Sequence, residues 1–318
     1  MRYFLPIGIL LVTLFLAVIV WWNNNLSPTG SSTTEKSIII PKGESFGAVS
    51  QKLQNEGLIK STLVFNLYAR QQGLSDKLQP GTFKLSPSMG AREILQAITS
   101  QPLEIWVTLL EGWRKEEMAD KLNQALGIDK GQFIKKAKEG YMFPDTYLFS
   151  KDITVDQIVE TMENTFDQKL TDDIKNKFKS QGLTQEQGVV LASIVEREAR
   201  SDEVRTKVAG ILLKRFTIEM GLNADATVQY ALGYQPKEKS WWKRHLAKAD
   251  LQIDSPYNTY LHAGLPPAPI SNPSLSSLKA VANADSSTPY LYYYHDSRGN
   301  SYYAKTLEEH NQNVANHP

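Results

Sequence analysis

The 318-residue sequence contains no cysteine, and its five histidines do not cluster. A chain without thiols forms no disulfide and offers no thiolate to a metal or a substrate. The histidines lack the H-x-x-x-H spacing that places two imidazoles on one helix face, so the sequence predicts neither a metal site nor a cofactor. They stand at positions 245, 262, 295, 310 and 317.

The sequence also has no excess of charge of either sign. Its 35 lysine and arginine residues nearly balance 34 aspartate and glutamate residues, and no long basic run is present. Proteins that bind nucleic acid usually carry a basic stripe, so nucleic acid is not expected as a partner. The absence of a G-x-S-x-G motif and of a glycine-rich phosphate loop leaves esterase and nucleotide-binding functions without support.

Residues 3–22, YFLPIGILLVTLFLAVIVWW, carry no charged side chain. About twenty apolar residues at ~1.5 Å per residue can cross the ~30 Å hydrocarbon core of a membrane, so residues 1–22 predict a short N-terminus and a transmembrane helix. A cleavable signal peptide is the alternative. It is less favoured because the run exceeds the ~7 to 15 residues of a signal-peptide core and ends in Trp21 and Trp22 instead of small residues.

The basic residues that flank this run predict its orientation. Arg2 precedes the run, and the next basic residue is Lys36. The positive-inside rule then leaves the N-terminus in the cytoplasm and places the chain from about Asn23 onward outside it, in the periplasm if the cell has two membranes. We therefore expect a single-pass protein of the cell (inner) membrane. Residues 23–36, rich in Asn, Ser and Thr, predict a flexible linker.

Residues 37–100 predict a small α+β module. Ser45 is placed to cap one helix, and Ser61 or Thr62 to cap a second. A Pro-Gly turn and an alternating pattern of apolar residues follow. The other elements expected in the module are a strand from Ser37, a strand at 82–85 and a helix at 91–99.

Residues 101–318 predict a larger, mainly helical domain with long loops, so the fold class is α+β overall. Pro144 and the aromatic residues between positions 131 and 149 favour a structured loop there. The composition after Gly221, rich in Pro, Tyr, Asn and Gly, favours a face built from loops. The elements expected are a strand within LEIWVTLLEG at 103–112, a helix from about Arg114, and helices at about 154–169, 171–180, 184–200 and 203–219.

The helix predicted over residues 184–200 carries two glutamates near its end. It begins with a capping box formed by Thr184 and Gln187. The apolar residues in its middle point in nearly every direction, so we expect it to run through the centre of the domain. Glu196 has Arg200 four residues later, the favourable order for an ion pair, and a paired or solvated role is sufficient to explain it.

Glu198 lies on an apolar face of the same helix, with another acid, Asp202, four residues later. Desolvation and a nearby like charge both raise the pKa of a carboxyl group, which is what a general acid needs at neutral pH. The alternative is that Glu198 marks the point where the last turn meets solvent, with Ser201 or Asp202 capping the next helix. The residues alone do not decide between the two. The apolar neighbours of Glu198 on the helix are Leu191, Ile194 and Val195.

Two aromatic segments follow in the loop-rich part of the chain. Residues 255–273, SPYNTYLHAGLPPAPISNP, offer Tyr257, Asn258 and Tyr260, whose ring faces and amide are of the kind that bind sugars, on a backbone stiffened by prolines. The alternative is that these tyrosines pack on the surface of the domain. The run YLYYY at 290–294 predicts a β-strand first and a platform for sugars second.

Five sequence blocks together resemble the YceG-like family of endolytic murein transglycosylases, and they occur in order over more than half of the chain. In that family the second glutamate of an E-x-E-[TA] element is the catalytic acid/base, which corresponds to Glu198 here, and Glu196 matches the first. The family often has Thr next, where this chain has Ala199. The blocks are EGYMFPDTY at 139–147, ASIVEREA at 192–199, LNADATVQYALG at 222–233, SPYNTYLHAGLPPAPISNPS at 255–274 and TPYLYYYHD at 288–296.

The resemblance implies a lyase that cleaves the β-1,4 bond between N-acetylmuramic acid and N-acetylglucosamine within glycan strands of peptidoglycan. A single carboxyl group serves this reaction, first as acid and then as base, and the product is a 1,6-anhydro end. A second carboxylate would indicate hydrolysis instead. Asp225 is the candidate for it, with a helix N-cap as its alternative role, and Asp225, Glu196, Tyr257, Asn258 and Tyr260 are the predicted substrate-binding residues.

The resemblance further implies that residues 37–100 form a LysM-like module, either a glycan-binding unit or a spacer, and that residues 101–318 form the YceG-like catalytic domain. Besides glycan strands and the membrane, peptidoglycan synthases and elongation or division proteins are candidate partners. Two other functions stay open at this point: a muramidase that uses Glu198 and Asp225, and a non-catalytic glycan-binding scaffold of the cell-wall machinery.

Overall fold

The computed structural model describes residues 4–100, 103–199 and 201–318, with side chains in the first helix described from Leu10 onward. The chain divides into two compact units. The first holds the residues before Thr108 together with Tyr147–Ile153, and the second holds the remainder. The boundary predicted between residues 100 and 101 adjoins residues 101 and 102, which lie outside the described residues.

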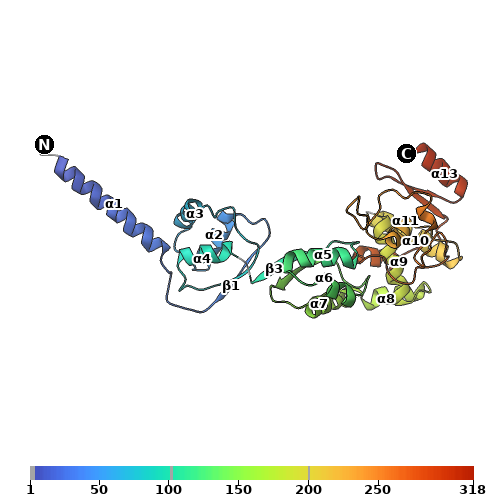
Figure 1. Ribbon diagram of the computed structural model, residues 1–318, viewed down its shortest axis with the longest axis horizontal. Coiled ribbons are helices and arrows are strands. Elements are labelled where there is room, and N and C mark those ends of the chain that lie inside the picture. Colours follow the sequence, from blue (N-terminus) through green and yellow to red (C-terminus); the bar gives the residue numbers. More distant parts are fainter. Residues whose placement is uncertain (1–3, 101–102, 200) are drawn as a thin grey trace. The chain divides into compact units, whose positions relative to one another are not determined.

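The first unit is a small α+β module that follows the long helix α1 (Figure 1). β1 and β2 pair antiparallel with Ile38 opposite Phe83, in a sheet of order β1-β2-β3-β4. The hydroxyls of Ser45 and Ser61 accept hydrogen bonds from the first turns of α2 and α3, so both predicted caps are confirmed. The elements are α1 (Phe4–Leu26), β1 (Lys36–Ile40), α2 (Phe46–Asn55), α3 (Thr62–Gln71), β2 (Gly81–Leu85), α4 (Ala91–Thr99), β3 (Glu104–Thr108) and β4 (Thr146–Ser150).

The segment between α1 and β1, predicted as a flexible linker, lies against the module. The Thr29 hydroxyl donates to the Gly57 carbonyl at 2.6 Å, and the Gly30 amide donates to the Pro87 carbonyl at 3.0 Å. Leu26, the last residue of α1, is buried in the core of the same unit. Over the residues that the structure describes, no helix has both the length and the hydropathy required of a membrane span.

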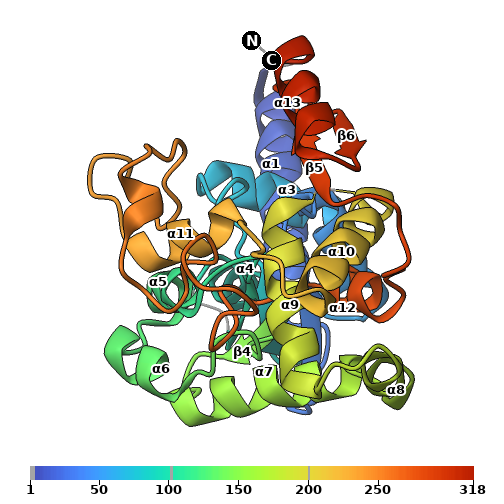
Figure 2. The ribbon, with the colours of Figure 1, turned by 90° about the vertical axis from the view of Figure 1, so that its right-hand side faces the viewer.

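The second unit is mainly helical, and α9 runs through its core (Figure 2). α9 packs against four other helices of this unit, α8, α10, α11 and α12. The second unit contains α5 (Lys115–Leu126), α6 (Lys130–Lys136), α7 (Val155–Lys169), α8 (Asp172–Ser180), α9 (Gln185–Glu198), α10 (Asp202–Thr217), α11 (Asp225–Leu232), a 3-10 turn (Asp250–Gln252), α12 (Leu275–Ala282), β5 (Tyr292–His295), β6 (Ser301–Ala304) and α13 (Leu307–Asn316).

The predicted central helix is confirmed in α9. Thr184 and Gln187 form the expected capping box, and every residue from Gly188 to Val195 is buried. A β-carbon on Gly188 would lie 2.2 Å from the ring of Phe178, so only glycine permits this close approach of α9 to α8. The tight packing fixes where α9 ends, and therefore where Glu198 projects.

The loop predicted over residues 131–149 is wrong in part, because α6 and β4 occupy its two ends. The Asp129 carboxylate caps α6 by accepting from the Gln132 amide at 2.6 Å, and the side chain of Phe133 is fully buried. Pro144 restricts only its immediate neighbours, so it excludes neither a helix that ends at Lys136 nor a strand that follows.

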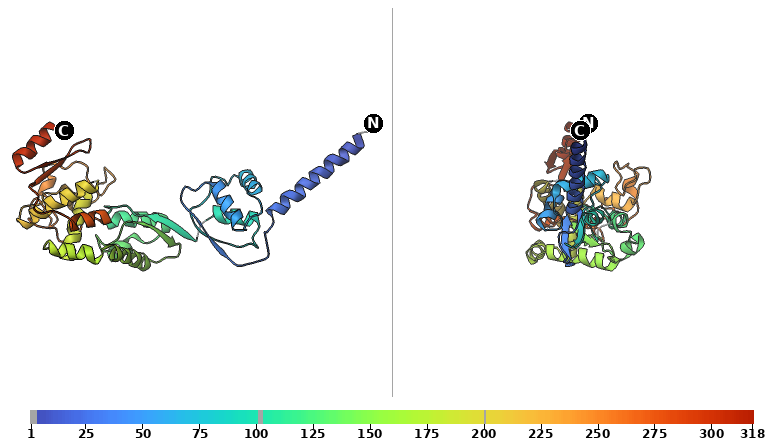
Figure 3. Two further views of the ribbon diagram at one scale, coloured as in Figure 1. Left: turned by 180° about the vertical axis from the view of Figure 1, so that it is seen from behind. Right: turned by 90° about the vertical axis from the view of Figure 1, so that its left-hand side faces the viewer.

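The predicted strand in the tyrosine run is confirmed as β5, which pairs antiparallel with β6 and places Tyr293 opposite Tyr303. α13 lies beside this hairpin at the C-terminal end of the chain (Figure 3). No residue of α13 is buried, and its His310 ring packs on Tyr292 with 5.5 Å between ring centroids.

Candidate active site

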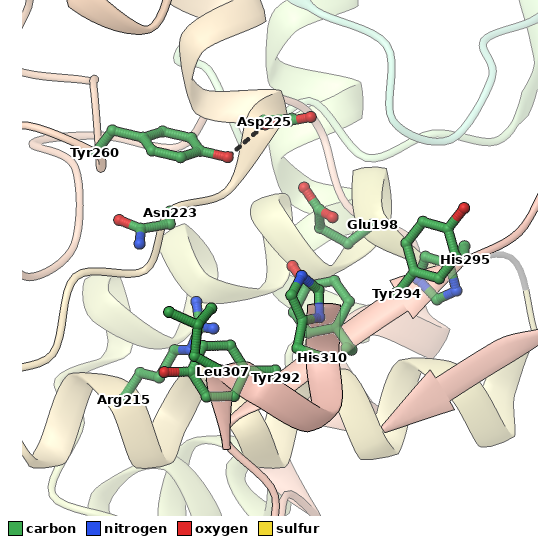
Figure 4. Close-up of a pocket in the computed structure, with 11 residues that line it drawn as sticks. Glu198, Arg215, Asn223, Asp225, Tyr260, Tyr292, Tyr294, His295, Leu307 and His310 are labelled. Atoms are coloured by element: carbon green, nitrogen blue, oxygen red, sulfur yellow. Dashed lines mark hydrogen bonds between the residues drawn. The ribbon is translucent and has the colours of Figure 1, made fainter. Parts of the chain in front are cut away.

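A cavity of about 450 Å³ opens in the second unit around the carboxyl group of Glu198 (Figure 4). Its walls come from the ends of α9 and α11, from α10 and α13, from β5 and from two loops. Polar and aromatic side chains dominate the lining. The lining residues are Glu198, Arg215, Asn223, Asp225, Tyr260, Tyr292, Tyr293, Tyr294, His295, Leu307 and His310.

Glu198 is the last helical residue of α9, and Ala199 after it is extended. The three apolar neighbours predicted for it on the helix are confirmed as fully buried, whereas Glu198 itself is partly exposed to the cavity. Its carboxylate accepts hydrogen bonds from the Tyr293 hydroxyl and from the Ala226 amide. Glu198 is therefore both at a helix end and in a cavity, so the two alternatives drawn from the sequence are compatible.

Burial raises the pKa of Glu198 to about 7. The negative charge of Asp225 also contributes to this rise, while the hydrogen bonds from Tyr293 and Ala226 and the charge of Arg197 reduce it. A carboxyl group with this pKa is partly protonated at neutral pH, so it can donate a proton and take one back.

Asp202, the neighbouring acid predicted from the sequence, does not act on Glu198, and that prediction is wrong. Asp202 is the first residue of α10, where its carboxylate bonds to Arg205 at 3.1 Å and to the hydroxyl of Ser276. The hydroxyl of Ser201 caps α10, as one of the two sequence alternatives proposed. The turn between α9 and α10 directs Asp202 away from Glu198, although an unbroken helix would have placed it one turn beyond.

Asp225 is the first residue of α11 and lines the same cavity as Glu198. Ala224 occupies the N-cap position, so the alternative role of Asp225 as N-cap is wrong. The Asp225 carboxylate accepts a hydrogen bond of 2.6 Å from the Tyr260 hydroxyl. Burial and this hydrogen bond raise the pKa of Tyr260 well above its ordinary value, so the phenol stays protonated as a donor.

Glu196 lies outside the cavity lining, in a buried ion pair. Its side chain is 4% exposed and bonds to Arg205 at 3.1 Å. Its other oxygen accepts from the amide of Ser274 at 2.8 Å and from the hydroxyl of the same residue at 2.5 Å. Glu196 thus ties α9 to α10 and to the start of α12. Its predicted partner, Arg200, lies outside the described residues.

The loop that carries the other predicted sugar contacts divides them between two places. Tyr260 lines the cavity, whereas Tyr257 packs on Tyr230 with 4.8 Å between ring centroids. Asn258 is fully buried, and its amide group donates to the carbonyls of Leu251 and Ile253 at 3.0 and 2.9 Å. These hydrogen bonds occupy the amide group of the Asn258 side chain, which stabilises the loop.

Several cavity residues were not predicted as site residues from the sequence. The tyrosine run contributes Tyr292, Tyr293 and Tyr294, so residues of the confirmed strand also line the cavity. Arg215 is buried and donates hydrogen bonds of 2.6 Å to the Leu291 and Leu222 carbonyls. The first of these holds the residue that directly precedes β5. No local pattern indicates Asn223, Leu307 or His310.

Sequence comparison with known proteins places this chain in a protein family. The sequence model of the YceG-like family matches residues 38–316, which is most of the chain. The chain belongs to the YceG-like family. Four of the five sequence blocks that carried the resemblance contribute residues to the cavity, and the central one contributes Glu198.

The relatives of this YceG-like chain include proteins of Bacillus subtilis and Streptococcus pneumoniae. It is 32% identical over 313 residues to a protein of Bacillus subtilis named endolytic murein transglycosylase, with 88% of this chain and 84% of that protein covered. It is 28% identical to the protein of the same name from Streptococcus pneumoniae (serotype 2, strain D39), over 87% of this chain and 57% of that longer protein. A solved YceG-like protein of Listeria monocytogenes has 27% identity and a TM-score of 0.63, with 88% of this chain and 99% of that chain covered.

The remaining block, residues 139–147, lies outside the cavity lining and forms a buried hydrogen-bond network. Glu139 in this block is 8% exposed, and it accepts hydrogen bonds from the Lys115 amide at 3.1 Å and from the Asn272 amide group at 2.8 Å. Asn272 also accepts from the amides of Gly140 and Met142, both at 2.9 Å. Burial raises the pKa of Glu139 to about 8. This network joins the start of α5 to the loop before α12.

Proposed function

We propose that this YceG-like protein is an endolytic murein transglycosylase, a lyase that cuts between N-acetylmuramic acid and N-acetylglucosamine within glycan strands of peptidoglycan. The observation that carries the proposal is the partly buried Glu198 with a pKa of about 7, in a cavity lined by tyrosines and by the amide group of Asn223. The names of the curated relatives support it.

In the proposed reaction Glu198 acts twice. The protonated carboxyl donates its proton to the glycosidic oxygen as the bond to C1 of the muramoyl residue breaks. The resulting carboxylate, stabilised by the Tyr293 hydroxyl and the Ala226 amide, accepts the proton of the C6 hydroxyl as that oxygen bonds to C1. Glu198 thus donates one proton and takes one back, and the product is a 1,6-anhydro end.

The second candidate function is a muramidase, because Asp225 shares the cavity with Glu198. We favour the lyase because the relatives are named endolytic murein transglycosylases, and the hydrogen bond of 2.6 Å from the Tyr260 hydroxyl to Asp225 is compatible with either reaction. Mass spectrometry of the ends released from murein sacculi separates the two. Products one water lighter than those of a muramidase support the lyase, and reducing ends contradict it.

Glu198→Gln tests whether the protein is an enzyme at all or a glycan-binding scaffold. We expect the release of muropeptides to fall by ~10² to 10⁴-fold, the usual contribution of a general acid or base. Glu203→Gln, on the exposed face of α10, is the matched control and should cleave as the wild type does. Undiminished cleavage by the Glu198→Gln protein, with the fold intact by circular dichroism, would remove Glu198 from the reaction.

We further propose that α1 anchors the protein in the cytoplasmic membrane, with the N-terminus inside and the chain after α1 outside. α1 has 23 residues, which at ~1.5 Å per residue extend over ~35 Å. Large apolar side chains along it are exposed, among them Leu10 at 67% and Val20 at 68%. Such an enzyme would meet glycan strands close to their synthases and to elongation or division proteins. Recovery of the full chain in the soluble fraction of lysed cells would contradict the anchor.

We also propose that the first unit is a LysM-like module that binds glycan. A cavity of about 580 Å³ opens between the loop before α2 and the loop before β2, with Arg70 and Asp76 in its lining. Arg70→Ala in the Glu198→Gln protein should reduce co-sedimentation with intact sacculi. Unchanged co-sedimentation would leave the module as a spacer.

A further inference from the structure

Arg215, on helix α10, is a buried cation without an acidic partner. Arg114 and Arg215 are equally buried, each 6% exposed. Arg114 pairs with Glu116 at 3.1 Å, whereas no ion pair among the described residues includes Arg215. A buried charge costs free energy unless an opposite charge and hydrogen bonds offset it. Since Arg215 lines the cavity around Glu198, a ligand can supply the missing anion.

The hydrogen bonds of Arg215 leave one nitrogen for such a ligand. Its Nε donates to the Leu291 carbonyl and its Nη1 to the Leu222 carbonyl, both at 2.6 Å. Nη2 has no hydrogen-bond partner among the described residues, and it is not one of their buried atoms that lack a partner, so part of its surface is accessible. The guanidinium also lies over the ring of Tyr292, 5.1 Å from its centroid. These contacts hold a charged donor in place at the cavity wall.

The two acids of the cavity do not neutralise this charge. Burial lowers the pKa of Arg215, and Glu198 acts on it in the opposite direction without forming an ion pair. With its own pKa of about 7, Glu198 is partly protonated at neutral pH. Asp225 is bound by the hydroxyl of Tyr260 at 2.6 Å. Because an arginine stays protonated even when buried, the cavity keeps a positive charge at Arg215.

Asn223 adds a neutral polar group beside this cation. Its backbone is in the left-handed region, with a φ of 48°, which asparagine adopts more readily than most residues. Arg215 binds the carbonyl before it, and the amides of Asn223 and Ala224 donate to the carbonyl and the hydroxyl of Thr259 at 3.3 and 3.0 Å. The exposed side-chain amide of Asn223 lines the cavity and has no hydrogen-bond partner among the described residues.

We propose that Arg215 and Asn223 form a subsite for a carboxylate of the substrate, carried by the lactyl group of the muramoyl residue or by the peptide attached to it. A guanidinium binds a carboxylate through charge-assisted hydrogen bonds, and an amide N–H can donate one more. Figure 4 shows both side chains to one side of Glu198. This inference rests on the proposed function of the cavity as a glycan site.

The subsite selects which of the two alternating sugars is cut. The lactyl group stands on C3 of the muramoyl ring, the same ring whose C1 loses the glycosidic bond, and the glucosaminyl ring carries no such group. A strand bound through this substituent therefore presents C1 of a muramoyl residue to Glu198. A strand shifted by one sugar leaves the Arg215 charge unpaired and binds more weakly.

The test compares strands that differ in their carboxylates. Strands that carry peptides, and strands from which an amidase has removed the peptides to free the lactyl carboxylate, are each used untreated and with all carboxylates capped as methylamides. Kd is measured with the detergent-solubilised full chain carrying Glu198→Gln, so that no strand is cut. We expect capping to raise Kd about tenfold, the lower end for a hydrogen bond to a charged group. An effect in the peptide-free strands assigns the lactyl carboxylate, and an effect confined to the others assigns the peptide.

Three substitutions in the same background locate the effect, measured as the ratio of Kd for capped strands to Kd for untreated strands. Arg215→Gln removes the charge and keeps an amide that can donate to a carbonyl, so the ratio should fall to about one. Asn223→Gly suits the left-handed backbone and removes the amide, so the ratio should fall about threefold. Lys207→Gln removes a positive charge from the exposed face of the same helix and, as the matched control, should keep the full ratio.

A Kd that capping leaves unchanged in both kinds of strand would overturn the proposal without any variant. So would a ratio that persists in Arg215→Gln, or one that Lys207→Gln lowers equally. If the melting temperature shows that Arg215→Gln does not fold, Asn223→Gly decides, because an unchanged ratio there contradicts the subsite. Cleavage by the chain with its native Glu198 reports separately on the proposed function. A tenfold ratio without any cleavage would retain the carboxylate subsite and reject the enzyme.

Discussion

Tyr293→Phe provides a sharp test of how the structure sets the acidity of Glu198. The substitution removes the hydroxyl that donates to the Glu198 carboxylate and leaves the aromatic ring in β5. The pKa of Glu198 is about 7, against 4.5 for an ordinary glutamate, a rise of 2.5 (7 − 4.5). Tyr293 is the largest of the influences that lower this pKa, so its removal should raise the pKa further.

The size of the change follows from the strength of one hydrogen bond to a charged group. Such a bond contributes ~1.5 to 3 kcal/mol, and about 1.4 kcal/mol corresponds to one pKa unit. The Ala226 amide still donates to Glu198, and water can enter the partly exposed site. We therefore take the lower end of the range and expect the pKa to rise by about one unit, to about 8.

The assay is kcat/KM on glycan strands between pH 5 and pH 9, because this quantity reports the pKa of the free enzyme. The alkaline limb of the profile, where Glu198 loses its proton, should move from about 7 to about 8. The acid plateau should fall about threefold, since the carboxylate that develops in the transition state has lost a donor.

Tyr294→Phe is the control for the loss of a hydroxyl from the same strand. Tyr294 lines the cavity, but it is not among the described residues that influence the pKa of Glu198. We expect its profile to keep the wild-type midpoint, whatever happens to KM. An unchanged midpoint in Tyr293→Phe, or the same shift in both variants, would refute the assignment of Tyr293.

Two other substitutions test charges in and near the site. Asp225→Asn removes a negative charge that raises the pKa of Glu198. The alkaline limb of the kcat/KM profile should therefore move below pH 7, in the direction opposite to that expected for Tyr293→Phe. A midpoint of this limb that rises or stays unchanged would contradict this electrostatic account. Burial raises the pKa of Glu139 from 4.5 to about 8, so the folded state binds this proton more tightly than the unfolded chain. The stability that results is complete below about pH 4.5 and is lost as the pH rises through about 8. Relative to the wild type, Glu139→Gln should therefore gain about 3 kcal/mol in the free energy of unfolding between pH 6 and pH 9, and a urea-midpoint difference that is constant over this range would contradict it.

Short-range rules predicted most of the helices before Gly221, whereas α12 and α13 lie in the part of the chain that was expected to form loops. The capping residues Ser45, Ser61 and Thr184 begin their helices as expected, because a cap depends only on atoms within three or four positions of it. The burial of α9 was also predictable, since apolar residues on every side of a helix must be covered. α6 was missed because its one buried anchor, Phe133, is too little to reveal an apolar face.

The candidate site was predictable only in part, because its residues come from distant positions in the chain. Counting helix faces singled out Glu198 from Glu196, and both lie where the helical period requires. Their partners did not follow from the period. Glu196 binds Arg205 and Ser274, and the acid near Glu198 is Asp225, because the turn after α9 redirects Asp202.

The sequence by itself singled out Glu198 as the candidate acid, since its apolar neighbours lie on the same helix and the resemblance to the family points to the same residue. Only the tertiary structure decided what acts on that acid. Tyr293 and Asp225 lie on β5 and α11, and they act on Glu198 through the packing of these elements around one cavity. Neither spacing nor composition encodes such contacts, because each depends on where separate elements end in space.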